Sequence, residues 1–96
     1  MMDTAYNRVI EMGPKGIMLP ETIHLTLDAT HMRCPLPLLK TKMALKTLAP
    51  EDILLVLATD SGAKKDIPRF IAHSQHRLML EAQDGAIFQF YIQVGS

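Results

Sequence analysis

The stretch that decides the fold is ILLVLA at residues 53–58, a continuous apolar run of strand length. Since no polar residue interrupts it, we expect a strand at the centre of a sheet, covered on both faces or nearly so. Pro50 precedes the run and ends the segment before it, whereas Asp60 or Ser61 follows as the N-cap of a helix. The run therefore predicts a central strand between two helical segments.

The residues before the central strand predict a strand and then a helix. Apolar and polar residues alternate over 23–28, which is typical of a strand with one buried face. Residues 34–37, CPLP, open a helix, because prolines are tolerated in a first turn whose N–H groups have no intrahelical partner. The buried stripe of this helix recurs at helical spacing: Leu38, Thr41, Leu45 and Leu48.

The residues after the central strand predict a second helix. Pro68 lies inside its pattern, so we expect either a bend there or a first turn that is separate from the regular helix. The helical spacing places five side chains on one face: Ala63, Ile67, Phe70, Ile71 and Ser74.

Two alternating stretches, 78–82 and 88–94, predict the last two strands. Asp84-Gly85 between them predicts a hairpin through a type I′ turn, which needs positive φ at both central positions. The predicted element order is β-α-β-α-β-β. Helical crossovers favour parallel pairing and the hairpin is antiparallel, so we expect an α/β (α+β) two-layer sandwich in which two helices pack on a mixed four-stranded sheet.

Length and composition limit the organisation of the chain. Its 96 residues and 10.7 kDa fit one domain, which we place at residues 21–96, after an N-terminal arm and linker at residues 1–20. Ten basic residues balance ten acidic ones, so no global field attracts nucleic acid or anionic membrane. We find no secretory signal pattern and no apolar stretch of membrane-spanning length, and we expect a cytoplasmic protein without a membrane partner.

Cys34 is the only cysteine, and it therefore cannot form an intramolecular disulfide. Free cysteines are often buried and inert, which is one interpretation of this thiol. Its position between Arg33 and a proline-marked helix start favours the other interpretation. There, the helix dipole and nearby Arg33 and Lys40 would stabilise a thiolate, so we expect an exposed, reactive thiol of low pKa.

Other chemistries have less support in the sequence. The four histidines lack the paired spacing of zinc ligands, and no glycine-rich nucleotide motif is present, so we expect neither a metal nor a cofactor. His31 lies three residues before Cys34 and is a candidate base for a thiol hydrolase, although a solvated loop histidine is the alternative.

Two blocks of the sequence resemble the TusA/SirA-like sulfur-carrier family. Leu27-Asp28 followed by RCPLPL at 33–38 resembles its Cys-Pro-x-Pro signature, and ATD at 58–60 through KDIPRF at 65–70 resembles a second family block. The resemblance covers roughly residues 24–94. It departs from the family pattern at His31 and Glu51, where glycine is usual, and at Ser61, where proline is usual.

The resemblance implies a carrier rather than a free-standing enzyme. Cys34 would accept a persulfide sulfur from a cysteine desulfurase or rhodanese-like donor and pass it to a downstream relay protein. In the TusA branch this relay ends in 2-thiolation of tRNA wobble uridine, without direct nucleic-acid binding expected here. The alternative is a regulatory or adaptor module of the same fold. Around Cys34, the expected supporting residues are Arg33, Pro35, Pro37 and His31, and the expected docking or structural residues are Asp60, Lys65, Asp66 and Arg69.

Overall fold

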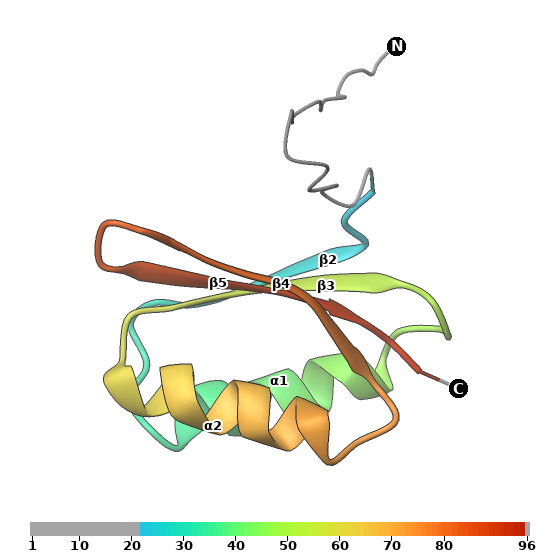
Figure 1. Ribbon diagram of the computed structural model, residues 1–96, viewed down its shortest axis with the longest axis horizontal. Helices are drawn as coiled ribbons and strands as arrows, with labels where there is room; N and C mark the ends of the chain where they lie inside the picture. The colour runs from blue at the N-terminus through green and yellow to red at the C-terminus, as the bar shows by residue number, and fades with distance from the viewer. Residues whose placement is uncertain (1–21, 96) are drawn as a thin grey trace, which may run out of the picture.

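The computed structural model describes residues 22–95, and the predicted arm at residues 1–20 lies outside them. The predicted element order is confirmed, with the first strand beginning later than expected (Figure 1). The elements are β2 (Leu25–Ala29), α1 (Leu36–Lys46), β3 (Ile53–Ala58), α2 (Ser61–Ala72), β4 (Arg77–Asp84) and β5 (Ile87–Gln93).

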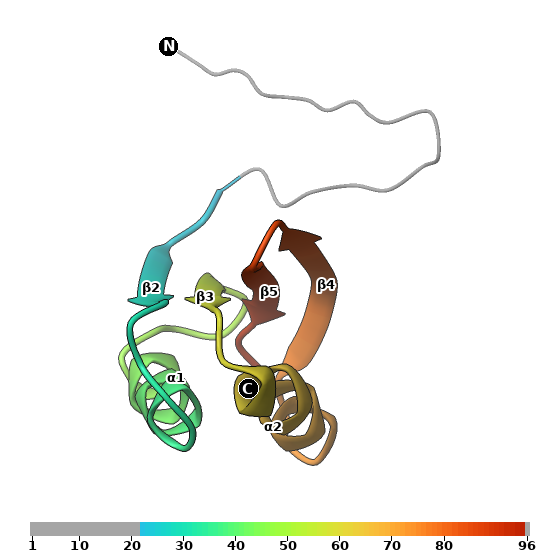
Figure 2. The same ribbon diagram turned by 90° about the vertical axis from the view of Figure 1, so that its left-hand side faces the viewer.

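The four strands form one mixed sheet in the order β2-β3-β5-β4. The α1 crossover makes β2 and β3 parallel, whereas β5 is antiparallel to both β3 and β4. Figures 1 and 2 show both helices on the same face of the sheet, with α1 beneath β2 and β3 and α2 beneath β5 and β4. The predicted two-layer sandwich is therefore confirmed, and ILLVLA is an inner strand.

The core lies between the helices and the inner strands. In β3, Leu54 and Val56 are fully buried and face the same side as their β5 partners Ile92 and Phe90. The alternate residue Leu55 is only half-buried, because both helices within residues 22–95 lie on the other face of the sheet. Truncating a fully buried aromatic such as Phe90 to alanine costs about 3–5 kcal/mol, so these contacts dominate the stability of the sandwich.

A β-bulge in β4 changes the predicted faces of that strand. Leu78 pairs with Ile92, but Leu80 pairs with Tyr91, the next residue along β5. Neighbouring residues of a regular strand point to opposite faces, so Leu78 and Leu80 lie on opposite faces of the sheet. The expectation that Leu78, Leu80 and Ala82 share a face is therefore wrong, because one extra residue in β4 reverses the alternation.

The β4–β5 hairpin is present, but its turn lies one residue later than predicted. Asp84 still belongs to β4 and pairs with Ile87, which leaves Gly85 and Ala86 at the central positions. Gly85 has φ 61°, and Ala86 has no positive φ. Positive φ at the first central position alone is the pattern of a type II′ turn, so the type I′ prediction is wrong.

The helix α2 is continuous through Pro68, so its first turn is not separate. Asp60 is its N-cap, and the carboxylate accepts a hydrogen bond from the backbone N–H of Gly62 at 2.9 Å. Ala63, Ile67 and Ile71 are buried against the sheet, as the spacing predicts. Neither helix of the described residues combines the length and apolarity that crossing a membrane requires.

Candidate functional site

The candidate site lies where β2 and β3 end. Because the carboxyl ends of parallel strands meet at one edge of a sheet, the loop that leads to α1 lies beside the loop that leads to α2. The Thr59 hydroxyl donates a hydrogen bond of 2.8 Å to the backbone carbonyl of Thr30 and joins the two loops. Residues separated by a whole strand and helix are thereby held together at the starts of both helices.

The loop before Cys34 is held by Asp28. The backbone N–H and hydroxyl of Thr30 donate to the Asp28 carboxylate at 3.0 and 2.6 Å. These hydrogen bonds, the side-chain one first, lower the pKa of Asp28, and the charge of His31 adds to this effect. Asp28 therefore stabilises the loop before Cys34 through its hydrogen bonds with Thr30, and the charge of His31 lowers the pKa of Asp28.

Cys34 lies immediately before α1. Pro35 is the N-cap of the helix and Pro37 is buried in its first turn, so the expectation that Cys34 lies beside the N-cap is confirmed. The Cys34–Pro35 peptide bond is cis. The thiol is exposed, which excludes the interpretation of Cys34 as a buried structural cysteine.

The charges that act on the thiol are acidic. The Cys34 Sγ donates a hydrogen bond to Oδ2 of Asp66 at 3.2 Å. This hydrogen bond is the largest cause of a raised Cys34 pKa, followed by partial desolvation and by the negative charges of Asp66 and Asp60. The expected low pKa is therefore wrong, because α2 brings two carboxylates to the thiol, and Arg33 is not among the groups that shift its pKa.

Gly62 permits this close approach of α2 to Cys34. A Cβ atom added at Gly62 would lie 2.8 Å from the Cys34 Cβ, 3.1 Å from its Sγ and 2.8 Å from Oδ2 of Asp60. Real side chains do not approach so closely without moving a neighbour. Only glycine at this position therefore allows α2 to start against the cysteine.

The structure brings together some of the predicted site residues. Cys34, Asp60 and Asp66 form one cluster, and Pro35 and Pro37 shape the helix start beside it. Within residues 22–95, none of the other predicted residues forms a hydrogen bond or ion pair with Cys34. These residues are His31, Arg33, Lys65 and Arg69.

Sequence reasoning missed Gly62 and an exposed apolar row on α1. Leu36, Leu39 and Met43 are 47%, 46% and 59% exposed, and their spacing places them on one face of α1, the helix that Cys34 precedes. The inward residues Thr41 and Leu45 could have revealed this row, because they leave three apolar residues on the opposite face. We call these three residues the α1 row.

The described histidines contribute to loops and strand ends. Nδ1 of His24 accepts a hydrogen bond from the backbone N–H of Ile53 at 2.9 Å, and Nδ1 of His76 accepts one from Gly95 at 3.0 Å. Across residues 22–95, no cluster of three or more His, Cys, Asp or Glu side chains could hold a metal ion.

Comparison with protein families matches residues 25–94 to the family described as Sulfurtransferase TusA. The chain belongs to the TusA family. Two relatives in Neisseria meningitidis serogroups A and B bear the name "Putative sulfur carrier protein"; each is 40% identical over 68 residues, 71% of this chain and 92% of the relative. YrkI of Bacillus subtilis has the same designation and is 41% identical over 69 residues, 72% of this chain and 92% of YrkI.

A crystal structure shares the TusA-family fold found here. The SirA-like protein of Desulfitobacterium hafniense superposes with a TM-score of 0.66 at 20% sequence identity, covering 75% of this chain and 99% of that one. The resemblance seen in the two sequence blocks is thereby confirmed at the level of family and fold. Family membership and the names of the relatives support a sulfur-carrier role.

Proposed function

We propose that this TusA-family chain carries sulfur as a persulfide on Cys34. The observation that carries the proposal is the placement of its only cysteine, exposed at the end of the molecule where both helices begin. A carrier needs an accessible sulfur that a donor and then an acceptor can reach. A single thiol also has no partner in the same chain with which to form a disulfide.

The transfer is a thiol–persulfide exchange. The Cys34 thiolate attacks the outer sulfur of a donor persulfide, the S–S bond of the donor breaks, and the donor leaves as a thiolate. Cys34 then holds the outer sulfur as a persulfide, and an acceptor thiolate removes that sulfur by the same exchange. The donor class that fits is a cysteine desulfurase or a rhodanese-like protein, and the acceptor class is a downstream relay protein.

Asp66 is proposed as a positioning residue for this exchange. Its carboxylate keeps the resting thiol protonated and is the group within hydrogen-bond reach that can take the proton when the thiolate forms. A cation of the docked donor beside Asp66 would weaken the effect of the carboxylate on the Cys34 pKa. The thiolate would then form in the complex, where the persulfide is present, rather than in the free carrier.

The α1 row is proposed as part of the donor surface, because it begins beside Cys34 and is exposed and apolar. Asp60 caps the start of α2 and Lys65 lies in its second turn, so both would contribute charged contacts near Cys34, and Arg33 and His31 would contribute from the loop before Cys34. Arg69 lies in the last turn of α2 and would contribute only to a more distant part of the surface. Apolar anchors with a charged rim are the usual composition of a protein interface. We propose that the transfer takes place between proteins in the cytoplasm, without direct tRNA contact, with tRNA 2-thiouridine as one final product.

Intact mass after incubation with a cysteine desulfurase and cysteine tests the carrier proposal. The wild type should gain the mass of one sulfur atom, and a reductant should remove it. Cys34→Ser should gain nothing. The absence of the increment on the wild type, or its presence on Cys34→Ser, contradicts the proposal.

The adaptor alternative is separated by the same variant. The α1 row is apolar whether or not Cys34 is intact, so a pure adaptor would bind its partner and act equally well as Cys34→Ser. A carrier with Cys34→Ser should still bind the desulfurase but should fail to restore 2-thiouridine in tRNA of a strain that lacks the carrier.

A further inference from the structure

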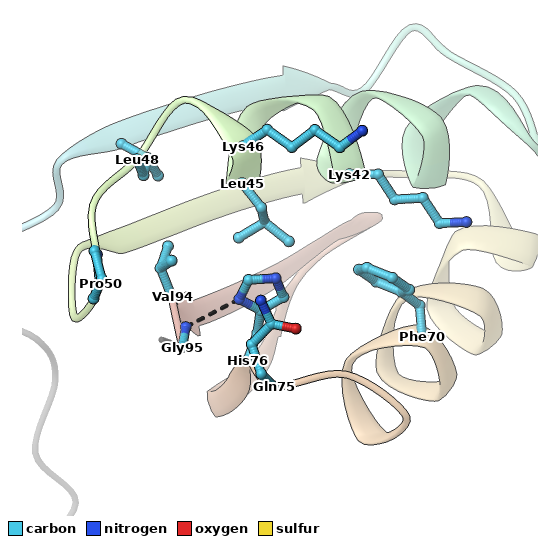
Figure 3. A pocket seen from close by; sticks show the side chains of 10 residues that line it. All are labelled: Lys42, Leu45, Lys46, Leu48, Pro50, Phe70, Gln75, His76, Val94 and Gly95. Carbon is cyan, nitrogen blue, oxygen red and sulfur yellow. Dashed lines mark hydrogen bonds between the residues drawn. The ribbon is translucent and has the colours of Figure 1, made fainter.

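A second candidate site lies at the other end of the helical layer. A cavity of about 440 Å³ is bounded by the last turns of α1 and α2, the residues that follow α2, and the end of β5 (Figure 3). Cys34 precedes the first turn of α1, so the cavity and the thiol occupy opposite ends of the helices (Figure 1). The volume falls in the range of about 300–1,000 Å³ that is typical of small-molecule sites.

The inner surface of the cavity is apolar. Leu45 and Val94 are buried side chains at the edge of the core, and the half-buried ring of Phe70 forms the adjacent wall. Figure 3 shows the His76 ring between Val94 and Phe70, with Leu45 above it. An aliphatic or aromatic body placed here would lose contact with water against a preformed surface.

The polar groups of the cavity are mainly donors and cations. Lys42 and Lys46 extend from α1, and Nζ of Lys42 lies 5.1 Å from the centroid of the Phe70 ring. Nδ1 of His76 accepts the Gly95 N–H, so the neutral ring carries its proton on Nε2 and can donate from there. None of the lining residues within 22–95 is acidic.

The apolar wall and the two lysines together favour an anionic ligand. No arginine within residues 22–95 lines the cavity, and the Gly95 N–H already donates to His76, so the lysines offer point charges without the bidentate or backbone donors that commonly add to the recognition of phosphate. The neighbouring cavity shares Gln75 and Val94 but is lined by both Glu51 and Arg77, and therefore has no preference for an anion. Among the residues that the structure describes, the first cavity combines an apolar wall with two lysines and no acidic side chain.

We propose that this cavity binds a small monocarboxylate, with its apolar body against Leu45, Phe70 and Val94 and its carboxylate beside Lys42 and Lys46. This site is additional to the sulfur site and does not depend on it. Cys34→Ser should therefore bind the ligand as the wild type does.

NMR titration of the full chain with octanoate tests the proposal. We expect saturable amide shifts at Val94 and Gly95, and much weaker binding of octan-1-ol, acetate and inorganic phosphate. Octan-1-ol has the apolar chain without the charge, and acetate has the carboxylate without the chain. Inorganic phosphate is a compact oxyanion. Octan-1-ol or phosphate binding as tightly as octanoate overturns the proposal, as does a response centred on the α1 row instead of the cavity.

Substitution of the lysines provides the matched control. The double variant Lys42→Gln with Lys46→Gln should bind octanoate about tenfold more weakly, since it loses two exposed charge interactions. Lys64→Gln should bind normally, although Nζ of Lys64 lies over Phe88 at 5.3 Å much as Lys42 lies over Phe70. Equal octanoate affinity of the double variant and the wild type overturns the assignment of the carboxylate to these lysines.

Discussion

The Cys34 Sγ at the start of α1 donates a hydrogen bond to Oδ2 of Asp66 on α2, 3.2 Å away. This contact joins the Cys-Pro-x-Pro block to the second family block through the reactive atom. A cation beside Cys34 would lower its pKa by stabilising the thiolate. The Asp66 carboxylate raises the pKa, because it stabilises the protonated thiol. The Asp66 carboxylate therefore favours the protonated thiol in the free chain.

Asp66→Asn should lower the pKa of Cys34. Asparagine can still accept the S–H hydrogen bond, but the negative charge that favours the thiol is gone. The fraction of thiolate at neutral pH rises, so alkylation by iodoacetamide becomes faster and its pH profile moves to lower pH. Glu81→Gln on β4 removes one negative charge elsewhere and is the control. An unchanged profile for Asp66→Asn would show that the carboxylate does not set the thiol pKa.

Gly62→Ala should destabilise the protein by about 1–3 kcal/mol, because the added methyl group meets Cys34 and Asp60 and the helix start must shift. The sign of this change in the free energy of unfolding distinguishes a crowded helix start from an open one, since alanine is favoured over glycine by about 1 kcal/mol in an unobstructed helix. Urea unfolding measures the effect. Ser61→Ala, at the exposed neighbouring position, should change stability little. Stabilisation by Gly62→Ala would contradict the close approach of α2 to the cysteine.

Glu51→Gly should stabilise the protein by about 1 kcal/mol. Glu51 has φ 75°, the left-handed region in which side chains are strained by about 1–2 kcal/mol and glycine is not, and the gain is partly offset by the greater entropy of an unfolded glycine. Thermal and urea unfolding measure it. Glu81→Gly, in the part of β4 that pairs with β5 after the bulge, should lower the stability. A loss of stability on Glu51→Gly would argue against the strained conformation.

Stability should fall as the pH is lowered through the titration of His76. Burial lowers the pKa of His76 below its ordinary value of 6.5, so between the two pKa values the unfolded chain binds the proton and the folded chain does not. The contribution of neutral His76 to the free energy of unfolding is fully present above pH 6.5, and it disappears as the pH falls through the pKa of His76 in the folded chain. NMR titration of the His76 ring should give a midpoint below 6.5, and His76→Gln should reduce the pH dependence of urea unfolding. A midpoint at or above 6.5 contradicts the effect of burial.

The element order and the position of Cys34 could be predicted because local patterns determine them. ILLVLA has the length and apolarity that favour an inner strand, and the two prolines at 35 and 37 mark a helix start wherever that helix packs. The faces of β4 could not be predicted, since a single inserted residue at the bulge reverses every later side chain without changing the composition of the strand. The hairpin turn lies one residue later than predicted because the pairing of β4 with β5 extends to Asp84.

The sign of the Cys34 pKa shift depends on tertiary structure. In the sequence Arg33 is next to Cys34 and Asp66 is far along the chain. The packing of α2 against the start of α1 brings Asp66 to the thiol, so that Asp66 and not Arg33 shifts the Cys34 pKa. Gly62 gave a weak signal, because a glycine in the first turn of a helix is unexceptional until the neighbouring sulfur is known. At His31, where the family usually has glycine, the structure requires no positive φ, and Glu51 alone among the non-glycine residues of 22–95 adopts one.

The direction of α1 has a thermodynamic consequence. Its 11 residues, at ~1.5 Å each, extend over about 16 Å between the thiol end and the cavity end. A ligand in the cavity and a persulfide on Cys34 are therefore too far apart to touch, and they are coupled only if the structure between them, which includes α1 and α2, responds to one of them. By reciprocity, octanoate affinity measured on the loaded and unloaded carrier reports that coupling free energy, and equal affinities would mean that cargo and ligand are held independently by the same helix.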